Sequence, residues 1–308
     1  MRPAGATRTR LPDGRWHFQH GPIDLIIDAG GDPASVGCAL EDAWSRFQAV
    51  LSELVSELAL LRSPVQDALA VEGTVARRMV VACWPHRAQF ITPMAAVAGA
   101  VADELIEFFR ATAGVRRAYV NNGGDIALHL GAGSSFRVGL FADLSRVERR
   151  EAPRLDGDFE VAADTPVRGV ATSGWRGRSF SLGIADSVTV LGRCAAEADA
   201  AATMIANAVT IEDPAIVRRP ARELKDDTDL GDRLVTVQVG PLSASKIEQA
   251  LRAGQAHAQV LLEAGTIAGA VLCLQGAVSV VEMGEPSPVP LLPDAGRRAC
   301  TLKGLAGR

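Results

Sequence analysis

The sequence predicts an α+β fold in which mixed sheets pack against helices. The first reason is composition, because a chain with 48% hydrophobic and 22% charged residues can bury a sizeable core. The second is periodicity, since some segments repeat apolar residues at helical spacing and others are short apolar runs bounded by turn residues. The third is order, because helices and strands do not alternate strictly along the chain. The 308 residues suit one large domain or two modest ones.

The first predicted elements follow a polar leader, residues 1–22. Residues 23–28 are a short apolar run that predicts a strand, and the Gly-Gly-Asp-Pro sequence at 30–33 ends it in a turn. Apolar residues then recur at helical spacing over 35–61, and Pro64 ends that run because proline lacks a backbone donor. The pattern therefore predicts a strand, a turn and a long scaffold helix.

The next elements include a helix of small residues. Residues 76–82 are apolar enough to predict a strand. Thr92 and Pro93 then open a second helix in a favourable order, with threonine at the N-cap and proline at the first helical position. Over 94–102 this helix has almost no side-chain bulk, so another backbone or a ligand could approach it closely.

A glycine-rich hairpin is predicted in the middle of the sequence. Residues 118–130 contain two strand-like runs around Asn-Asn-Gly-Gly-Asp, the chemistry of a tight turn with positive φ. Residues 144–166 mix charges, proline and glycine and predict an extended loop. The alternating run 187–191 predicts a strand, and the alanine-rich run 194–209 predicts a third helix.

The last part of the sequence predicts one more helix among strands. A capped helix is expected over 243–262, and the strands are expected at 234–239, 267–274 and 277–282. The whole is interpreted as one α+β domain over 23–284, with two interleaved lobes as a variant. A flexible proline-rich tail is expected over 285–308.

Composition and charge exclude several classes of function. Lys and Arg total 32 against 36 for Asp and Glu, so no global positive field favours nucleic acid. Five scattered cysteines without a CxxC pair disfavour disulfides and zinc and suit a reducing compartment. The first 19 residues lack an apolar signal core and no run approaches the length of a membrane span, so we expect a cytoplasmic protein without a membrane partner. The Walker, GxSxG, GxGxxG and HExxH fingerprints are absent.

Asp199 and Thr203 have the most informative spacing in the sequence. They lie four residues apart in an alanine-rich helix, so both side-chain oxygens project from one helical face. Oxygen donors suit Mg²⁺ or Ca²⁺, and Mg²⁺ commonly takes one or two protein carboxylates and completes its octahedron with water and phosphate. The alternative is a threonine that hydrogen-bonds its own helix backbone.

A second candidate is a Thr-Ser-Gly segment followed by two arginines. Thr172, Ser173 and Gly174 offer hydroxyls and backbone N–H groups in a predicted loop, and Arg176 and Arg178 offer guanidinium forks. Such a set can hold a pyrophosphate. The alternative is an ordinary exposed turn with solvated arginines.

The third candidate is the hairpin turn itself. Gly123 and Gly124 would let the backbone approach a ligand, while Asn122 and Asp125 supply hydrogen-bonding side chains. A bare hairpin turn explains the same glycines.

Taken together and in this order, the segments resemble the ApbE family of flavin transferases. The similarity runs from about residue 92 to 209. The sequences of two segments, 93–103 and 179–190, are closer still to the UPF0280 branch of that superfamily. The segments are the small-residue helix ending in Asp103, the N-x-GGD-type hairpin at 122–125, the A-T-S-G segment at 171–174, the S-V-T-V strand at 187–190 and the A-D-A-x-x-T pattern at 198–203.

The resemblance implies T-fold-like halves with FAD, or FMN, bound in a cleft between them and Mg²⁺ held near the pyrophosphate by Asp199 and Thr203. It implies cofactor-binding roles for the hairpin and for the Thr172–Gly174 segment. Family members cleave FAD and pass the FMN moiety to a hydroxyl of an acceptor protein, a metal-assisted phosphoryl transfer. The resemblance thus implies an acceptor protein as a partner. Whether the chain also forms a homo-oligomer is left open.

One departure from the family pattern bears on catalysis. Where the family has a histidine-containing H-H-I-x-D-P-x-T-G segment, this chain has residues 179–186 without histidine. No catalytic residue is therefore assigned, because the transfer step lacks an obvious base. Asp186 and Ser181 are the substitutes at hand. The alternatives are a non-catalytic relative that binds a ligand or assembles with a partner, and an enzyme for another anionic substrate.

Overall fold

The computed structural model describes residues 5–67, 69–140 and 157–282, and it confirms the α+β class. The chain forms two compact units that are interleaved in sequence. Unit 1 is formed by residues 1–135, 162–171 and 192–200, and unit 2 by residues 136–161, 172–191 and 201–308. Helix α6, Ala195–Ala208, begins in unit 1 and continues into unit 2.

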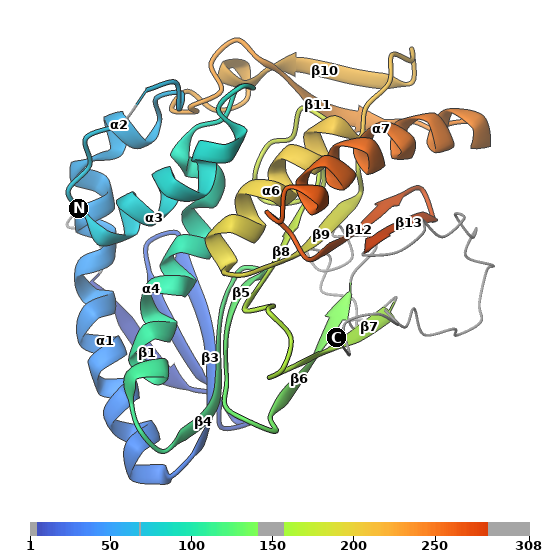
Figure 1. The fold of residues 1–308 in the computed structure, drawn as a ribbon. Helices are drawn as coiled ribbons and strands as arrows, with labels where there is room; N and C mark the ends of the chain where they lie inside the picture. Colours follow the sequence, from blue (N-terminus) through green and yellow to red (C-terminus); the bar gives the residue numbers. More distant parts are fainter. Residues whose placement is uncertain (1–4, 68, 141–156, 283–308) are drawn as a thin grey trace. The chain divides into compact units, whose positions relative to one another are not determined.

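Unit 1 contains an antiparallel sheet with helices packed on it (Figure 1). Helix α4 packs on β4 and β5, and α1 packs on β2 and β3. The strands in spatial order are β1 (Thr7–Arg10), β2 (Trp16–His20), β3 (Ile23–Gly31), β4 (Val115–Asn122), β5 (Asp125–Leu130) and the first residues of β8 (Gly169–Ser173). The helices are α1 (Pro33–Ser56), α2 (Leu58–Leu61), α3 (Thr74–Cys83) and α4 (Val97–Ala111), with short 3-10 turns η1 (Trp84–His86) and η2 (Pro93–Ala96).

Unit 2 contains several antiparallel strand pairings and helix α7, which packs on β12 and β13. Strands β9 and β13 both pair with β12, β10 pairs with β11, and β6 pairs with β7. The elements are β6 (Ser135–Leu140), β7 (Gly157–Ala162), β9 (Ser187–Gly192), β10 (Ile216–Pro220), η3 (Ala221–Glu223), β11 (Leu234–Val239), α7 (Ala244–Glu263), β12 (Gly269–Leu274) and β13 (Ala277–Glu282).

The core of unit 1 follows from simple alternation. In β3, Ile23, Leu25 and Ile27 are buried while the residues between them are partly exposed, the period expected of a half-buried strand. Phe18 of β2 lies edge-on to Trp44 of α1, with ring centroids 5.0 Å apart. Aromatic pairs of this geometry stabilise beyond their buried area, so they fix the long helix on the sheet.

Several predicted elements are wrong or incomplete. Residues 76–82, expected as a strand, lie in helix α3, because its buried residues recur at helical rather than alternating spacing. The predicted helix over 35–61 is interrupted at Glu57, which separates α1 from α2. The polar leader contains β1 and β2, and the predicted loop 144–166 contains β7; residues 141–156 of that loop and the predicted tail lie outside the described residues. Strands β6 and β10 were not predicted.

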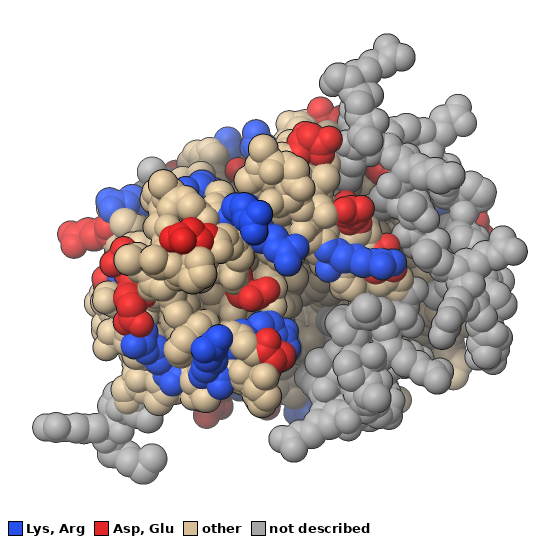
Figure 2. Space-filling model, turned by 90° about the horizontal axis from the view of Figure 1, so that it is seen from below, with Lys and Arg blue, Asp and Glu red and all other residues tan. Residues whose placement is uncertain are grey.

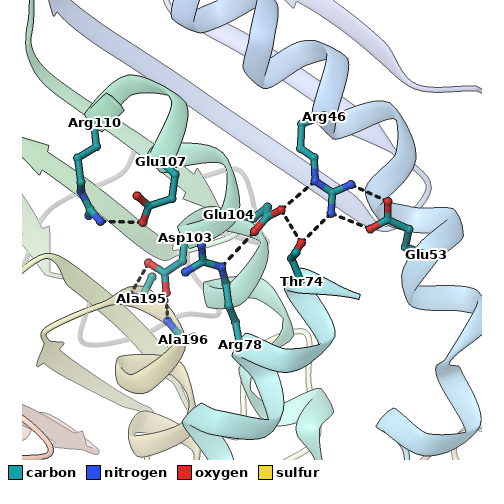
Figure 3. Close-up of polar contacts among 10 residues, drawn as sticks. All are labelled: Arg46, Glu53, Thr74, Arg78, Asp103, Glu104, Glu107, Arg110, Ala195 and Ala196. Carbon is teal, nitrogen blue, oxygen red and sulfur yellow. Dashed lines mark hydrogen bonds and ion pairs between the residues drawn. The ribbon is translucent and has the colours of Figure 1, made fainter. Parts of the chain in front are cut away.

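An ionic network around the buried Glu104 joins three helices of unit 1 (Figure 3). Glu104 of α4 accepts hydrogen bonds from Thr74 at 2.6 Å, Arg46 at 2.8 Å and Arg78 at 3.1 Å. Arg46 also contacts Glu53 with both terminal nitrogens. Burial alone would raise the pKa of Glu104, but these hydrogen bonds and the nearby charges hold it below its ordinary value.

Replacement of Glu104 tests this network. Glu104→Gln is expected to lower the free energy of unfolding at neutral pH by about 2 kcal/mol, because Arg46 and Arg78 lose charge-assisted hydrogen bonds to this carboxylate while Arg46 keeps its pair with Glu53. Since the folded-state pKa is depressed, the stabilisation is present above the ordinary Glu value of 4.5 and is lost as pH falls through the lower folded value. Urea unfolding at descending pH measures both effects. The control is Glu107→Gln, whose exposed pair with Arg110 on the same helix is worth less than about 1 kcal/mol.

Candidate functional site

In unit 1, helices α4 and α6 each supply a carboxylate that caps the N-terminal turn of the other helix. Asp103 of α4 accepts the N–H groups of Ala195 at 2.9 Å and Ala196 at 2.8 Å, the first two residues of α6 (Figure 3). Asp199 of α6 accepts the N–H of Gly99, in the first turn of α4, at 3.0 Å. Carboxylates satisfy the free N–H groups of a helix start and favour its positive dipole end. Each helix therefore caps the other.

Close backbone approach makes this arrangement geometrically feasible. A Cβ on Gly99 would lie 2.3 Å from the carbonyl oxygen of Ala195, and a Cβ on Gly169 would lie 2.0 Å from the carbonyl carbon of Cys194. Only glycine fits at either position without a shift of backbone. The small residues over 94–102 thus allow backbone approach, one of the two alternatives that the sequence left open.

Asp199 lies in an environment that disfavours its charge. Burial raises its pKa well above the usual range, and the nearby charge of Asp125 raises it further, against the hydrogen bonds from Gly99 and Ala98. The residue as a whole is nevertheless partly exposed. A cation bound beside Asp199 and Asp125 would stabilise the ionised carboxylates, which burial and mutual repulsion disfavour.

The glycine hairpin is confirmed as a tight turn between β4 and β5. Gly123 and Gly124 have φ of 66° and 115°, and the N–H of Gly124 donates to Asn121 Oδ1 at 2.8 Å. Asn122, which is buried, donates from Nδ2 to the carbonyl oxygen of Ala98 at 3.1 Å. Asp125 is paired with Asn122 across the hairpin. The hairpin is thereby held against the first turn of α4, the turn that Asp199 also contacts.

A single methyl group tests the backbone requirement of this turn. Gly124→Ala is expected to destabilise the protein by about 1–2 kcal/mol, since no atom lies within 4 Å of the new Cβ but φ of 115° is strained for alanine. Thermal unfolding measures the loss. Gly37→Ala is the matched control, because Gly37 is exposed in α1 with open space around it, and alanine there is expected to stabilise by about 0.5–1 kcal/mol. Equal behaviour of the two variants would contradict the strained turn.

The Thr-Ser-Gly segment lies in unit 2, and it is a strand end rather than the predicted loop. Thr172 and Ser173 are the last residues of β8, and both are partly accessible. Thr172 Oγ1 lies 2.9 Å from Thr189 Oγ1 of β9. Gly174 follows where a Cβ would lie 2.5 Å from the carbonyl oxygen of Asp186. The segment is thus packed closely against residues 186–189.

Asp186 and Ser181 have structural contacts. Asp186 is buried, with Trp175 Nε1 3.2 Å and Arg176 Nε 3.3 Å from its Oδ1, and it also accepts the N–H of Gln275. Ser181 donates to Asn207 Oδ1 at 3.3 Å. Arg176 is therefore paired with Asp186 and lies over the Trp175 ring, while Arg178 is exposed. These contacts anchor the segment that follows β8.

The thiols near Asp199 and Asp103 are protonated at neutral pH. Burial and the charge of Asp199 raise the pKa of Cys83 well above its ordinary value, and burial and the charge of Asp103 raise that of Cys194 to about 12. A neutral thiol is a poor nucleophile and a poor metal ligand. The four cysteines among the described residues are free.

Sequence reasoning predicted three segments, and two of them meet in unit 1. Asn122 and Asp199 both contact the first turn of α4. Thr203 is partly exposed and lies one turn further along α6, in the part of that helix that belongs to unit 2. Thr172, Ser173 and Gly174 belong to unit 2. The role of Asp103 was missed, although it ends the small-residue motif and is a buried acid in an apolar helix, which is itself a signal.

Among the described residues, no group of three His, Cys, Asp or Glu side chains is arranged to hold a metal ion. In the same part of the chain, no helix combines the length and the hydropathy that crossing a membrane requires. On the face that Figure 2 shows, basic and acidic side chains are interspersed. A mixed surface of this kind agrees with the absence of a global positive field.

The described residues thus define an α+β protein in which two helix starts cap each other beside a glycine hairpin. The family model described as "AbpE bacteria" matches residues 8–280, and the chain belongs to that family. Within it, the chain belongs with the UPF0280 proteins: the one from Methanosarcina acetivorans is 38% identical over 203 residues, covering 65% of this chain and 74% of that protein.

Other UPF0280 proteins match over shorter stretches. The Methanospirillum hungatei protein is 36% identical over 146 residues, covering 47% of this chain and 55% of the relative. The Methanothrix thermoacetophila protein is 40% identical over 121 residues, covering 39% of this chain and 47% of the relative. This chain therefore spans about half the length of these two relatives.

Solved structures with a distant similarity include two transferases. The Pseudomonas stutzeri flavinyl transferase ApbE is 13% identical with a TM-score of 0.40, covering 92% of this chain and 93% of that one. The Vibrio cholerae flavin transferase ApbE is 12% identical with a TM-score of 0.39, covering 92% and 97%.

Proposed function

We propose that this protein binds a flavin nucleotide, FAD or FMN, together with Mg²⁺. The observation that supports this best is the electrostatic coupling of Asp199 with Asp125, because repulsion between two carboxylates is relieved when a cation binds beside them. The flavin itself is inferred from the ordered motifs shared with the ApbE family of flavin transferases.

The donor set fits Mg²⁺. Asp199 and Thr203 would hold the ion, since they lie one turn apart in α6 and both are partly accessible. Hard oxygen donors in small number match an ion that keeps several waters and bridges to phosphates. When bound, Mg²⁺ would neutralise charge on the pyrophosphate.

The nucleotide would contact the two segments that the motif order selects. Asn122, Gly123, Gly124 and Asp125 would present backbone and side-chain groups from the hairpin. Thr172, Ser173 and Gly174 would present hydroxyls and N–H groups from the end of β8. Hydroxyl and backbone N–H donors are suited to phosphate oxygens.

Calorimetric titration of the protein with FAD, with and without Mg²⁺, tests the binding. We expect binding that requires Mg²⁺, and the same titration with FMN identifies which nucleotide is preferred. Absence of FAD and FMN binding at every Mg²⁺ concentration would refute the proposal.

Two activities are compatible with such a site, transfer of FMN to an acceptor protein and cleavage of FAD. A second candidate function is ligand binding or assembly without catalysis. It is favoured by the contacts of Asp186 and Ser181, which occupy the two groups that could replace the family histidine. A further alternative is another anionic substrate in the same site.

Product analysis separates these candidates. The protein is incubated with FAD, Mg²⁺ and candidate acceptor proteins, and AMP release is followed over time. Steady AMP production excludes the non-catalytic function; binding without AMP supports it. A cytoplasmic location and a homo-oligomeric state remain part of the proposal, tested by cell fractionation and by light scattering.

A further inference from the structure

We propose that Asp103 is a positioning residue that determines where Asp199 lies, and through it the affinity for Mg²⁺. This inference rests on the proposed function, because it concerns the same site. Asp103 is 4% exposed and both of its carboxylate oxygens accept backbone N–H groups of α6. It touches no substrate and acts through the helix that it holds.

The contacts form a closed path between two helices. Asp103 holds Ala195 and Ala196, and Asp199 follows one helical turn later in α6. Asp199 then returns to α4 by accepting the N–H of Gly99. An α-helix has a regular geometry with a rise of 1.5 Å per residue. The position of the first turn of α6 therefore determines where the Asp199 carboxylate lies one turn further on. Asp103 therefore determines the position of Asp199 through helix α6.

The chemistry of the contact requires a carboxylate of this length. Burial raises the pKa of Asp103, whereas the two N–H groups that its oxygens accept favour the ionised form, which has no donor to place against them. Asparagine would direct its NH₂ group at one of the two N–H groups, leaving a buried donor unsatisfied. Glutamate would keep the charge, but its extra methylene would push the first turn of α6 away. The close approach of Gly99 to Ala195 would then be lost.

Three variants separate position from charge and from stability. Asp103→Asn keeps the size and loses the charge, whereas Asp103→Glu keeps the charge and changes the reach. Glu104→Gln is the matched control, because it is the adjacent buried carboxylate of α4 and contacts α1 and α3 side chains instead of α6. All are measured at a temperature at which the variants remain folded by circular dichroism.

Two readouts are used on the full chain. The first is Mg²⁺ affinity by calorimetry in the presence of FAD, which depends on the proposed function. The second is hydrogen exchange of the Gly99 amide by NMR without metal or nucleotide, which reports whether Asp199 still accepts that N–H. The second readout remains informative even if the wild-type protein binds no Mg²⁺, so failure of the proposed function is distinguished from failure of the positioning role.

We expect both Asp103 variants to weaken Mg²⁺ binding at least about tenfold and to accelerate exchange at Gly99, as is typical when a residue that orients a metal ligand is changed. Glu104→Gln is expected to alter the affinity by less than about twofold. Unchanged affinity and Gly99 exchange in Asp103→Glu would show a charge effect alone and overturn the proposal. An equal loss in Glu104→Gln would show a general stability effect and overturn it too. If Asp103→Asn does not fold, Asp103→Glu decides by the same criteria.

Discussion

Asp199→Asn is expected to reduce the Mg²⁺-dependent affinity for FAD more than about 100-fold while leaving the fold intact. Changes to residues that only orient a metal ligand cost about 10–100-fold, so loss of the ligand itself should exceed that range. The amide oxygen of asparagine can still accept the N–H of Gly99, so the cap on α4 is retained. Calorimetric titration with FAD in the presence of Mg²⁺ measures the change.

Stability and its pH dependence provide an independent readout for the same variant. Since the folded-state pKa of Asp199 is raised, by burial first and by Asp125 second, the wild type without metal is relatively stabilised at low pH and loses that stability as pH rises through the raised value. Asp199→Asn should abolish this loss. Asp32→Asn is the control, because it makes the same chemical change at the exposed N-cap of α1 and should leave FAD affinity unchanged. Wild-type affinity in Asp199→Asn would exclude it as a ligand.

Gly99→Ala is expected to destabilise the protein by about 3 kcal/mol or more and to weaken any ligand binding at this site. The added Cβ would lie 2.3 Å from the oxygen and 2.5 Å from the carbon of the Ala195 carbonyl, both of them backbone atoms that cannot rotate away. Overpacking of this kind usually costs about 1–3 kcal/mol, and separation of two helix starts adds lost hydrogen bonds. Urea unfolding measures the loss.

Gly37→Ala again provides the comparison, since it places the same methyl group in a helix with open space around it. There the helix propensity of alanine should stabilise the protein by about 0.5–1 kcal/mol. If Gly99→Ala had the stability of the wild type, the close contact of α4 with α6 would be disproved.

Local patterns predicted those elements whose residues interact with near neighbours. The hairpin was predicted because Gly123 and Gly124 supply the positive φ that its turn requires. Helix α6 was predicted because alanine favours helix regardless of its surroundings. Helix α3 was mistaken for a strand, since Val80 and Val81 favour strands while the buried positions follow a helical period. Strand β1 was missed because its residues are polar, and β2 because it lies within the segment interpreted as a polar leader. Pairing stabilises both, since β1 pairs with β2 and β2 pairs with β3.

The candidate site was predicted in part for the same reason. The i, i+4 spacing of Asp199 and Thr203 follows from helix geometry, but their surroundings do not. That Asp199 meets Gly99 and that Asp103 meets Ala195 depends on contacts 100 and 92 residues apart in sequence. No periodicity within either helix indicates which distant backbone it approaches. Similarly, the contact of Asp186 with Gln275 spans 89 residues, so residue type alone could not distinguish an anchor from a base.

The reciprocal caps of α4 and α6 also impose an order on synthesis. Gly99 leaves the ribosome 100 residues before the carboxylate that accepts its N–H. At about 5–20 residues per second, that interval is roughly 5–20 s. During it, α4 lacks the acceptor at its start, and the small-residue surface around Gly99 that α6 later covers is open to water. Completion of unit 1 therefore waits for the arrival of α6, and chains interrupted between residues 111 and 195 should be recognised by chaperones and proteases as unfinished.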